Sequence, residues 1–341
     1  MITIGVIAAI VGTIGALQID WFPGEAAKSA HKIDTVYDVL LIASVPIFVL
    51  VMTVVIYSVL KFRARPGDMS DGAPIHGNTR LEVFWVTVPF LMVTGLAIYG
   101  WIVLNDLEAK QPDTLTVNVT GQQFTWHFQY PQEGKATTNE LVLPKDRPVE
   151  FRIHTKDVIH SFWVPEFRLK SDAVPGLTTK VRLTPDRLGK YQVVCAELCG
   201  LGHSTMRTPV RVVRQGAFAS WVKKANGGGG GGGGGAAKKL GGKQVFLSNG
   251  CGSCHALADA GTSGAVGPKF DDLAAQAAKF GKSRGQTPAQ YVKQSIESPE
   301  AFTVPGFPKG VMPKDFKNQL SGAQIDALVS YLLRVSGGKG K

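Results

Sequence analysis

Cysteine is scarce in this chain. Only four of the 341 residues are cysteine, and they form two close pairs, Cys195 with Cys199 and Cys251 with Cys254. Each pair is followed closely by a histidine, which is typical of a metal or cofactor motif and not of a disulfide framework. With both pairs committed to such motifs, no cysteine is left for a structural disulfide.

Charge is absent from two long hydrophobic runs. Residues 39–60 and 83–104 contain no Asp, Glu, Lys or Arg. A helix of that length, at about 1.5 Å per residue, crosses the roughly 30 Å hydrocarbon layer of a membrane. Pro46 and Pro89 lie inside the runs, where neighbouring helices can satisfy the freed backbone groups. The sequence therefore predicts a transmembrane helical hairpin over residues 35–108.

A third uncharged run covers residues 1–19. A cleaved signal segment usually starts with Lys or Arg and ends with small residues, and neither feature is clear here. This favours an additional N-terminal membrane helix, with a signal segment as the alternative.

The loop between the two runs is basic at its start, with Lys61, Arg63 and Arg65. The positive-inside rule places this loop in the cytoplasm. All four cysteines then lie on the outer side of the bacterial cytoplasmic membrane.

The last part of the chain is also basic. Residues 236–341 contain 14 Lys and Arg against 7 Asp and Glu. Such a surface favours an acidic partner or an anionic lipid surface. Nucleic acid is excluded as a partner by the predicted outer-side location.

Residues 113–214 predict an all-β domain. Short runs of alternating or β-branched residues are separated by turns, as in a β-sandwich or barrel. These runs are residues 114–120, 149–154, 180–184, 191–194 and 209–213.

The most informative motif lies between the last two runs. It consists of Cys195, Cys199, His203 and Met206. Two thiolates, an imidazole and a thioether suit copper; a disulfide or a zinc site would leave the thioether unexplained. The motif predicts a metal-binding loop whose ends are held by a β-hairpin.

Residues 226–239 predict a flexible linker, because Asn226 is followed by nine consecutive glycines. Residues 240–337 then predict a helical domain. Ser321 with Gln324 three residues later is a capping-box signature for the last helix.

This helical domain begins with the C-x-x-C-H motif Cys251, Cys254 and His255, which is typical of covalent haem c attachment. A zinc or redox pair is the alternative. Met312 is the only methionine after the motif, and no histidine follows it, so Met312 is expected as the second axial iron ligand. A core methionine is the alternative.

Residues 30–214 resemble subunit II of cytochrome c oxidase. The resemblance rests on the cysteine loop and on the segment His160-Ser-Phe-Trp-Val-Pro165. It implies a cupredoxin-like domain with a binuclear CuA centre. Its ligands would be His160, Cys195, Cys199, His203, Met206 and the backbone carbonyl of Glu197.

The resemblance also implies roles beyond the copper ligands. The Glu197 carboxylate would reach a magnesium ion shared with subunit I, and Asp172 would lie at the same interface. Glu82 would lie near a proton-uptake entrance; a charge reaching the membrane surface is the alternative. Phe124 stands where the family usually has the tryptophan that accepts electrons, so Trp126 is a further candidate for the electron path.

Residues 240–337 resemble a class I cytochrome c. Pro268 corresponds to the proline that packs on the histidine side of the haem. A solvent-exposed loop is the alternative for this proline.

Together the resemblances imply a multidomain membrane subunit that passes electrons from its own haem c to CuA. The electrons would continue to a catalytic subunit I that reduces oxygen to water with proton pumping, with subunit III as a further partner. The donor would be a quinol–cytochrome c reductase or a cytochrome c. The alternatives are a CuA-containing nitric oxide reductase subunit, and a membrane-bound electron carrier or redox sensor.

Overall fold

The computed structural model describes residues 2–63, 66–67, 74, 76–134, 136–227, 241–314 and 316–337. Arg65 and nearly all of the predicted glycine-rich linker lie outside these residues. The chain divides into two compact units, residues 1–109 and 110–341, which are taken separately below.

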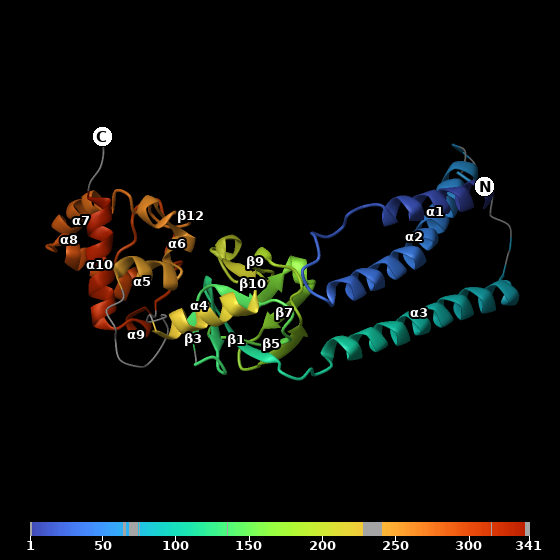
Figure 1. Ribbon diagram of the computed structural model, residues 1–341. Helices are drawn as coiled ribbons and strands as arrows, with labels where there is room; N and C mark the ends of the chain where they lie inside the picture. Colours follow the sequence, from blue (N-terminus) through green and yellow to red (C-terminus); the bar gives the residue numbers. More distant parts are fainter. Residues whose placement is uncertain are drawn as a thin grey trace. The chain divides into compact units, whose positions relative to one another are not determined.

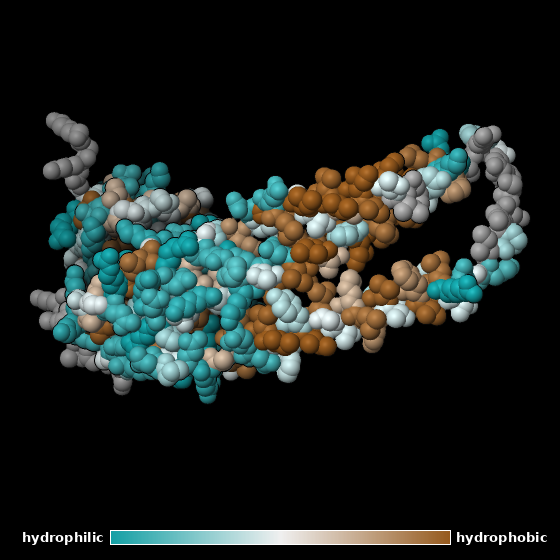
Figure 2. Space-filling model, turned by 45° about the vertical axis from the view of Figure 1, so that its right-hand side comes forward, coloured by the Kyte–Doolittle hydropathy of each residue, from teal (hydrophilic) through white to brown (hydrophobic). Residues whose placement is uncertain are grey.

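The described residues of the first unit form the helices α1 (Ile2–Leu17), α2 (Ala30–Lys61) and α3 (Thr79–Glu108) (Figure 1). Among the described residues, α2 and α3 are long and apolar enough to cross a membrane, and their apolar segments are not buried inside the protein. Figure 2 shows hydrophobic side chains along these helices. Such a surface is typical of helices that lie in lipid or against other membrane helices, and the two uncharged runs predicted as spans lie within α2 and α3.

Helix α1 packs on α2 through small residues. A Cβ added at Gly5 would lie 3.3 Å from Cγ2 of Thr53, and one added at Gly12 would lie 3.6 Å from Val45. Small side chains allow such close approach of helices in membranes. In the segment predicted as an N-terminal hydrophobic helix, residues Ile2–Leu17 are helical.

Helix α3 begins with a capped turn. The Asn78 side chain accepts a hydrogen bond from the Leu81 N–H at 3.2 Å, and Glu82 Oε1 accepts one from the Asn78 N–H at 3.2 Å. These bonds satisfy two N–H groups at the start of the helix. Glu82 thus has a structural role, and its place in proton uptake stays a prediction.

The second unit begins with a ten-stranded sandwich. One sheet has the order β3-β2-β1-β5-β8 and the other the order β4-β10-β9-β6-β7. The strands are β1 (Leu115–Gln122), β2 (Thr125–Tyr130), β3 (Ala136–Thr138), β4 (Leu141–Pro144), β5 (Val149–Thr155), β6 (His160–Val164), β7 (Leu169–Ala173), β8 (Thr179–Leu183), β9 (Gly189–Cys195) and β10 (Arg207–Val213).

Aromatic side chains from both sheets form the core of the sandwich. Trp126, Phe128, Phe151 and Phe162 are fully buried, and the Phe162 ring lies 5.3–6.4 Å from the other three. Each such side chain contributes about 1.5–3 kcal/mol by leaving water. Helix α4 (Gln215–Gly227) closes the domain.

The predicted all-β class is confirmed, and all five predicted runs are strands. Five further strands, β2, β3, β4, β6 and β7, were not predicted as strands. Strand β4 is buried at every position and β3 has only three residues, so neither shows the alternation that marks a half-buried strand.

The remainder of the second unit is mostly helical, as predicted, with one small hairpin. The helices are α5 (Gly242–Ser248), α6 (Cys251–Cys254), α7 (Leu273–Lys282), α8 (Pro288–Glu297), α9 (Phe316–Gln319) and α10 (Gly322–Ser336), and the hairpin is β11 (His255–Leu257) with β12 (Thr262–Ala265). The predicted capping box of α10 is present: Ser321 Oγ accepts from the Gln324 N–H, and the Gln324 side chain accepts from the Ser321 N–H.

Helices α5 and α10 cross closely. A Cβ at Gly242 would lie 2.1 Å from the Ala327 carbonyl oxygen, so only glycine fits there. This crossing buries Phe246 and Tyr331 and places the Cys251–His255 segment beside the core of the helical domain.

Candidate copper centre and haem pocket

Two neighbouring strands and one loop bring the predicted copper ligands together. Cys195 ends β9 and His160 begins β6, which is paired with β9. The loop returns to β10 directly after Met206, and the Cys195 N–H donates to the Met206 carbonyl at 3.1 Å. The ends of the loop are thus held by the β9–β10 hairpin, as predicted.

The donor atoms converge on one buried space. Cys195 Sγ lies 3.9 Å from Cys199 Sγ and 3.9 Å from His160 Nδ1. Cys199 Sγ lies 3.6 Å from His203 Nδ1 and 3.8 Å from Met206 Sδ. The Glu197 carbonyl oxygen lies 3.2 Å from Cys195 Sγ. Each of the six predicted donor atoms therefore lies within 3.9 Å of the Cys195 or the Cys199 sulfur atom.

The two cysteine sulfur atoms lie in contact, and this contact moves the pKa values of the two thiols in opposite directions. The interaction with Cys199 holds the pKa of the Cys195 thiol far below its usual range. The same interaction, together with burial, raises the pKa of Cys199. A lowered pKa favours the thiolate form of Cys195, which is the form that binds a metal cation.

His160 is oriented by a carboxylate. Burial opposes its charged form, but hydrogen bonds to Asp157 and Cys195 outweigh this and raise the pKa of His160. Its Nε2 lies 2.8 Å from Asp157 Oδ1, so Nδ1 faces the sulfur atoms. A carboxylate behind a ligating imidazole is a common feature of metal sites. Asp157 was not predicted as a site residue, although a carboxylate three residues before a candidate ligand histidine indicates a possible hydrogen-bond partner for that imidazole.

The two aromatic candidates for the electron path occupy different places. Trp126 is fully buried, with its ring 5.9 Å from that of His160. Phe124 packs on the cysteine loop, because a Cβ at Gly202 would lie 2.4 Å from the Phe124 ring. Phe124 is also nearly buried, so both rings belong to the inner wall of the copper centre.

Two other predicted residues lie at the surface. The side chain of Glu197 is exposed, and so is that of Asp172 on β7. The two exposed leucines of the loop, Leu198 and Leu201, are 77% and 65% exposed. The outer side of the loop therefore presents two large apolar side chains and a carboxylate to a neighbour.

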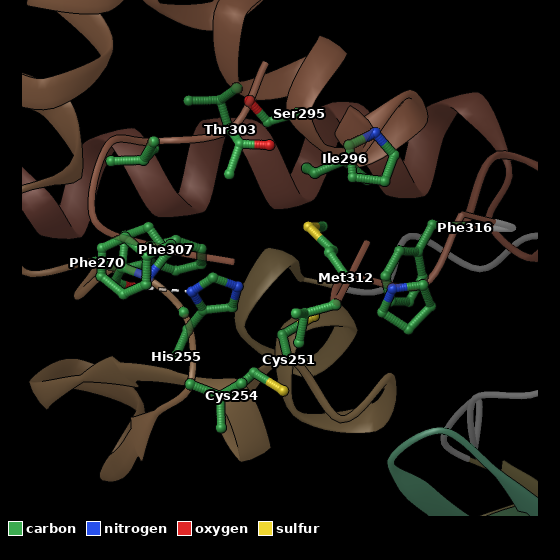
Figure 3. Close-up of a pocket in the computed structure, with 18 of the residues that line it drawn as sticks. Cys251, Cys254, His255, Phe270, Ser295, Ile296, Thr303, Phe307, Met312 and Phe316 are labelled. Carbon is green, nitrogen blue, oxygen red and sulfur yellow. Dashed lines mark hydrogen bonds between the residues drawn. The ribbon is translucent and has the colours of Figure 1, made fainter. Parts of the chain in front are cut away.

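The helical domain contains a cavity of about 170 Å³ that opens to the surface. His255 and Met312 project into it from different segments, and both cysteines of the C-x-x-C-H motif lie at its edge (Figure 3). Its walls are mainly apolar and include Phe270, Ile296, Phe302 and Phe307.

The histidine of this cavity is prepared as a ligand. Burial lowers the pKa of His255 to about 4, so the ring is neutral at pH 7. Its Nδ1 lies 2.8 Å from the Pro268 carbonyl oxygen, which leaves Nε2 free for iron, and its ring stacks on Phe270 at 4.0 Å. Two thiols, a neutral imidazole, a thioether and an apolar cavity fit a haem c.

Comparison with known proteins gives three family matches. Residues 15–103 match the transmembrane domain of cytochrome c oxidase subunit II, residues 133–213 match its periplasmic domain, and residues 240–336 match cytochrome c. The periplasmic match supports the outer-side orientation, and the matched domains imply CuA copper and haem.

Curated relatives agree with these matches. A cytochrome c oxidase subunit 2 of Thermostichus vulcanus is 31% identical over 64% of this chain and 83% of its own length. A second, from Alkalihalophilus pseudofirmus, is 30% identical over 80% of this chain and 78% of its own length. Among solved structures, the periplasmic domain of subunit II of cytochrome oxidase from Bradyrhizobium japonicum has 32% sequence identity to this chain and a TM-score of 0.33. The match covers 35% of this chain and 96% of that domain.

Proposed function

Since this chain belongs to the family of subunit II of cytochrome c oxidase and carries a cytochrome c domain, we propose that it is the electron-accepting subunit of a terminal oxidase. When bound, haem c would pass single electrons to CuA, which would deliver them to a catalytic subunit that reduces oxygen and pumps protons. The convergence of five soft or borderline donors and one backbone carbonyl at the copper loop carries this proposal.

The residues of this chain would hold the copper pair rigidly. Its ligands would be His160 at the start of β6 and, in the loop closed by the β9–β10 hairpin, Cys195, Cys199, His203, Met206 and the Glu197 carbonyl. Rigid ligation limits the change in geometry that accompanies gain of an electron. Trp126 and Phe124 would form the aromatic wall next to these ligands.

In the helical domain, Cys251 and Cys254 would form the thioether bonds to haem, and His255 and Met312 would be the axial ligands. The neutral state of His255 and its bond to the Pro268 carbonyl support this assignment. A thioether as second ligand raises the iron potential.

The catalytic subunit I would cover the outer side of the copper loop. Leu198 and Leu201 are exposed apolar side chains at this loop, and such side chains mark contact surfaces when they lie beside a functional site. The Glu197 carboxylate would hold a magnesium ion at this interface, with Asp172 nearby. Subunit III would complete the complex, and a quinol–cytochrome c reductase or a cytochrome c would be the donor.

The test is analysis of the purified membrane complex. We expect two coppers and one haem c per chain of this protein, together with oxygen uptake driven by reduced cytochrome c. Nitric oxide consumption without oxygen uptake would assign the chain to a nitric oxide reductase. Isolation without a catalytic subunit would favour an electron carrier or sensor.

Variants test the ligand assignments. Cys195→Ser should abolish the binuclear copper while the haem spectrum is kept. Met312→Ala should let carbon monoxide bind the ferrous haem while copper is kept. Full copper loading in the first variant, or an unchanged haem spectrum in the second, would refute the respective assignment.

A further inference from the structure

Gln123 is not a predicted copper ligand, yet its hydrogen bonds connect it to two of the predicted ligands, directly to Cys199 and through Asp157 to His160. It lies in the turn between β1 and β2. Its side-chain Nε2 donates to the Cys199 carbonyl at 2.6 Å, and its backbone N–H donates to Asp157 Oδ2 at 2.8 Å. The other oxygen of Asp157 is the one that accepts from His160.

Asp157 itself is held in place from several sides. Besides Gln123 and His160, it accepts from the Val158 N–H at 2.7 Å and from the Thr155 hydroxyl at 3.1 Å. A carboxylate with four donors cannot rotate without losing several bonds at once.

We propose that Gln123 and Asp157 form a positioning clamp that joins the two halves of the copper ligand set. Asp157 fixes the imidazole arm at His160, and Gln123 fixes the thiolate arm at Cys199. The clamp holds these arms at one separation whether or not the metal pair carries the extra electron. The inference rests on the proposed copper function, and both residues act through ligands without touching metal themselves.

Two measurable properties follow from this arrangement. Loss of an outer hydrogen bond typically weakens metal binding by about 10-fold to 100-fold. In addition, a carboxylate behind an imidazole makes the ring a stronger donor, which stabilises the oxidised, more positive metal pair. Removing the negative charge of Asp157 should therefore raise the copper reduction potential.

The experiment uses the full-length chain with copper and haem bound. Gln123→Leu and Asp157→Asn are compared with Gln129→Leu as the matched control. The Gln129 side chain accepts a hydrogen bond from the Asn118 amide at 3.1 Å, so its partner lies in β1 and not in the copper loop. For each variant we measure the rate of copper release to a chelator, the copper reduction potential and the copper electron paramagnetic resonance spectrum. The melting temperature of the copper-free protein is measured as well.

We expect Gln123→Leu to release copper to the chelator at least about 10-fold faster than the wild type. Asp157→Asn should show a raised copper reduction potential and an altered copper hyperfine pattern. Gln129→Leu should match the wild type in all of these measurements. Unchanged release and potential in both clamp variants would refute the clamp. The clamp would also be refuted if all three variants changed in parallel with their melting temperatures, because the contacts would then serve folding alone. A wild-type chain without a copper pair would refute the proposed function itself, which is a separate result.

Discussion

In the copper domain, the predicted ligands are brought together by the protein's own hydrogen bonds: His160 by the β6–β9 pairing and by Asp157, and the cysteine loop by the β9–β10 hairpin. In the haem domain, the predicted ligands instead line a mainly apolar cavity. The difference suggests that the copper domain can form its site before it binds metal, whereas the haem domain needs its cofactor as part of its core.

The largest expected effect comes from preventing haem attachment. In a Cys251→Ser, Cys254→Ser double variant, the cavity would stay empty. At about 24 cal/mol per Å³, a cavity of about 170 Å³ corresponds to about 4 kcal/mol, which is close to the whole stability of a marginally stable domain. We expect the thermal unfolding transition of the haem domain to disappear and that of the sandwich to remain.

The control for this variant is Ser253→Ala, which changes the same motif but keeps both thiols. Circular dichroism and differential scanning calorimetry report the two transitions. If the helical domain of the double variant melted at its normal temperature, the supposed contrast between the domains would be wrong.

A smaller effect is expected where α5 crosses α10. Gly242→Ala would place a methyl group 2.1 Å from the Ala327 carbonyl oxygen, so the helices must move apart. Overpacking of this kind costs about 1–3 kcal/mol. The melting temperature of the haem-bound domain should fall, whereas Gly322→Ala in α10, which has nothing within 4 Å of its added methyl group, should not lower it. Equal melting temperatures in the two variants would contradict this packing.

In the sandwich, the pH dependence of the free energy of unfolding tests how much the contacts of the Glu150 carboxylate stabilise the fold. Burial of Glu150 would raise its pKa, but hydrogen bonds from Arg152 and Arg182 outweigh this and lower it. A lowered pKa in the folded state gives stability that is present above the unfolded-state pKa, near 4.5, and is lost as the pH falls through the folded-state pKa.

Glu150→Gln should therefore lower the free energy of unfolding by about 1–2 kcal/mol at pH 7 and have much less effect near pH 3. Urea unfolding of the copper-free protein at both pH values measures this. Glu140→Gln, which breaks the more exposed pair with Arg211, should have a smaller effect. A pH-independent loss in Glu150→Gln would show that charge is not the cause.

The smallest structural effect is expected for Met206→Leu. Met206 is fully buried and its Sδ lies 3.8 Å from Cys199 Sγ, and leucine has a similar volume. A thioether is a weak copper ligand, so copper should stay bound while its reduction potential and visible spectrum change. The copper content and a redox titration test this; loss of copper would show that the thioether holds the metal more strongly than expected.

The copper loop, the C-x-x-C-H motif and the two uncharged runs could all be recognised in the sequence, because their residues are close together along the chain. The strands that carry the rest of the site were harder to predict. His160 was assigned only through the family resemblance, since β6 is short and almost entirely buried and therefore shows no clear period.

The sequence by itself determined the chemistry of this protein: which donor atoms are present, which runs can cross a membrane, and where the domains lie. Only the tertiary structure decided which distant groups support those donors. Gln123, Asp157 and Cys199 are separated by up to 76 residues along the chain, and hydrogen bonds between them depend on strand pairing and turn geometry. Local patterns record residue type and spacing, whereas such contacts arise only when the two sheets pack.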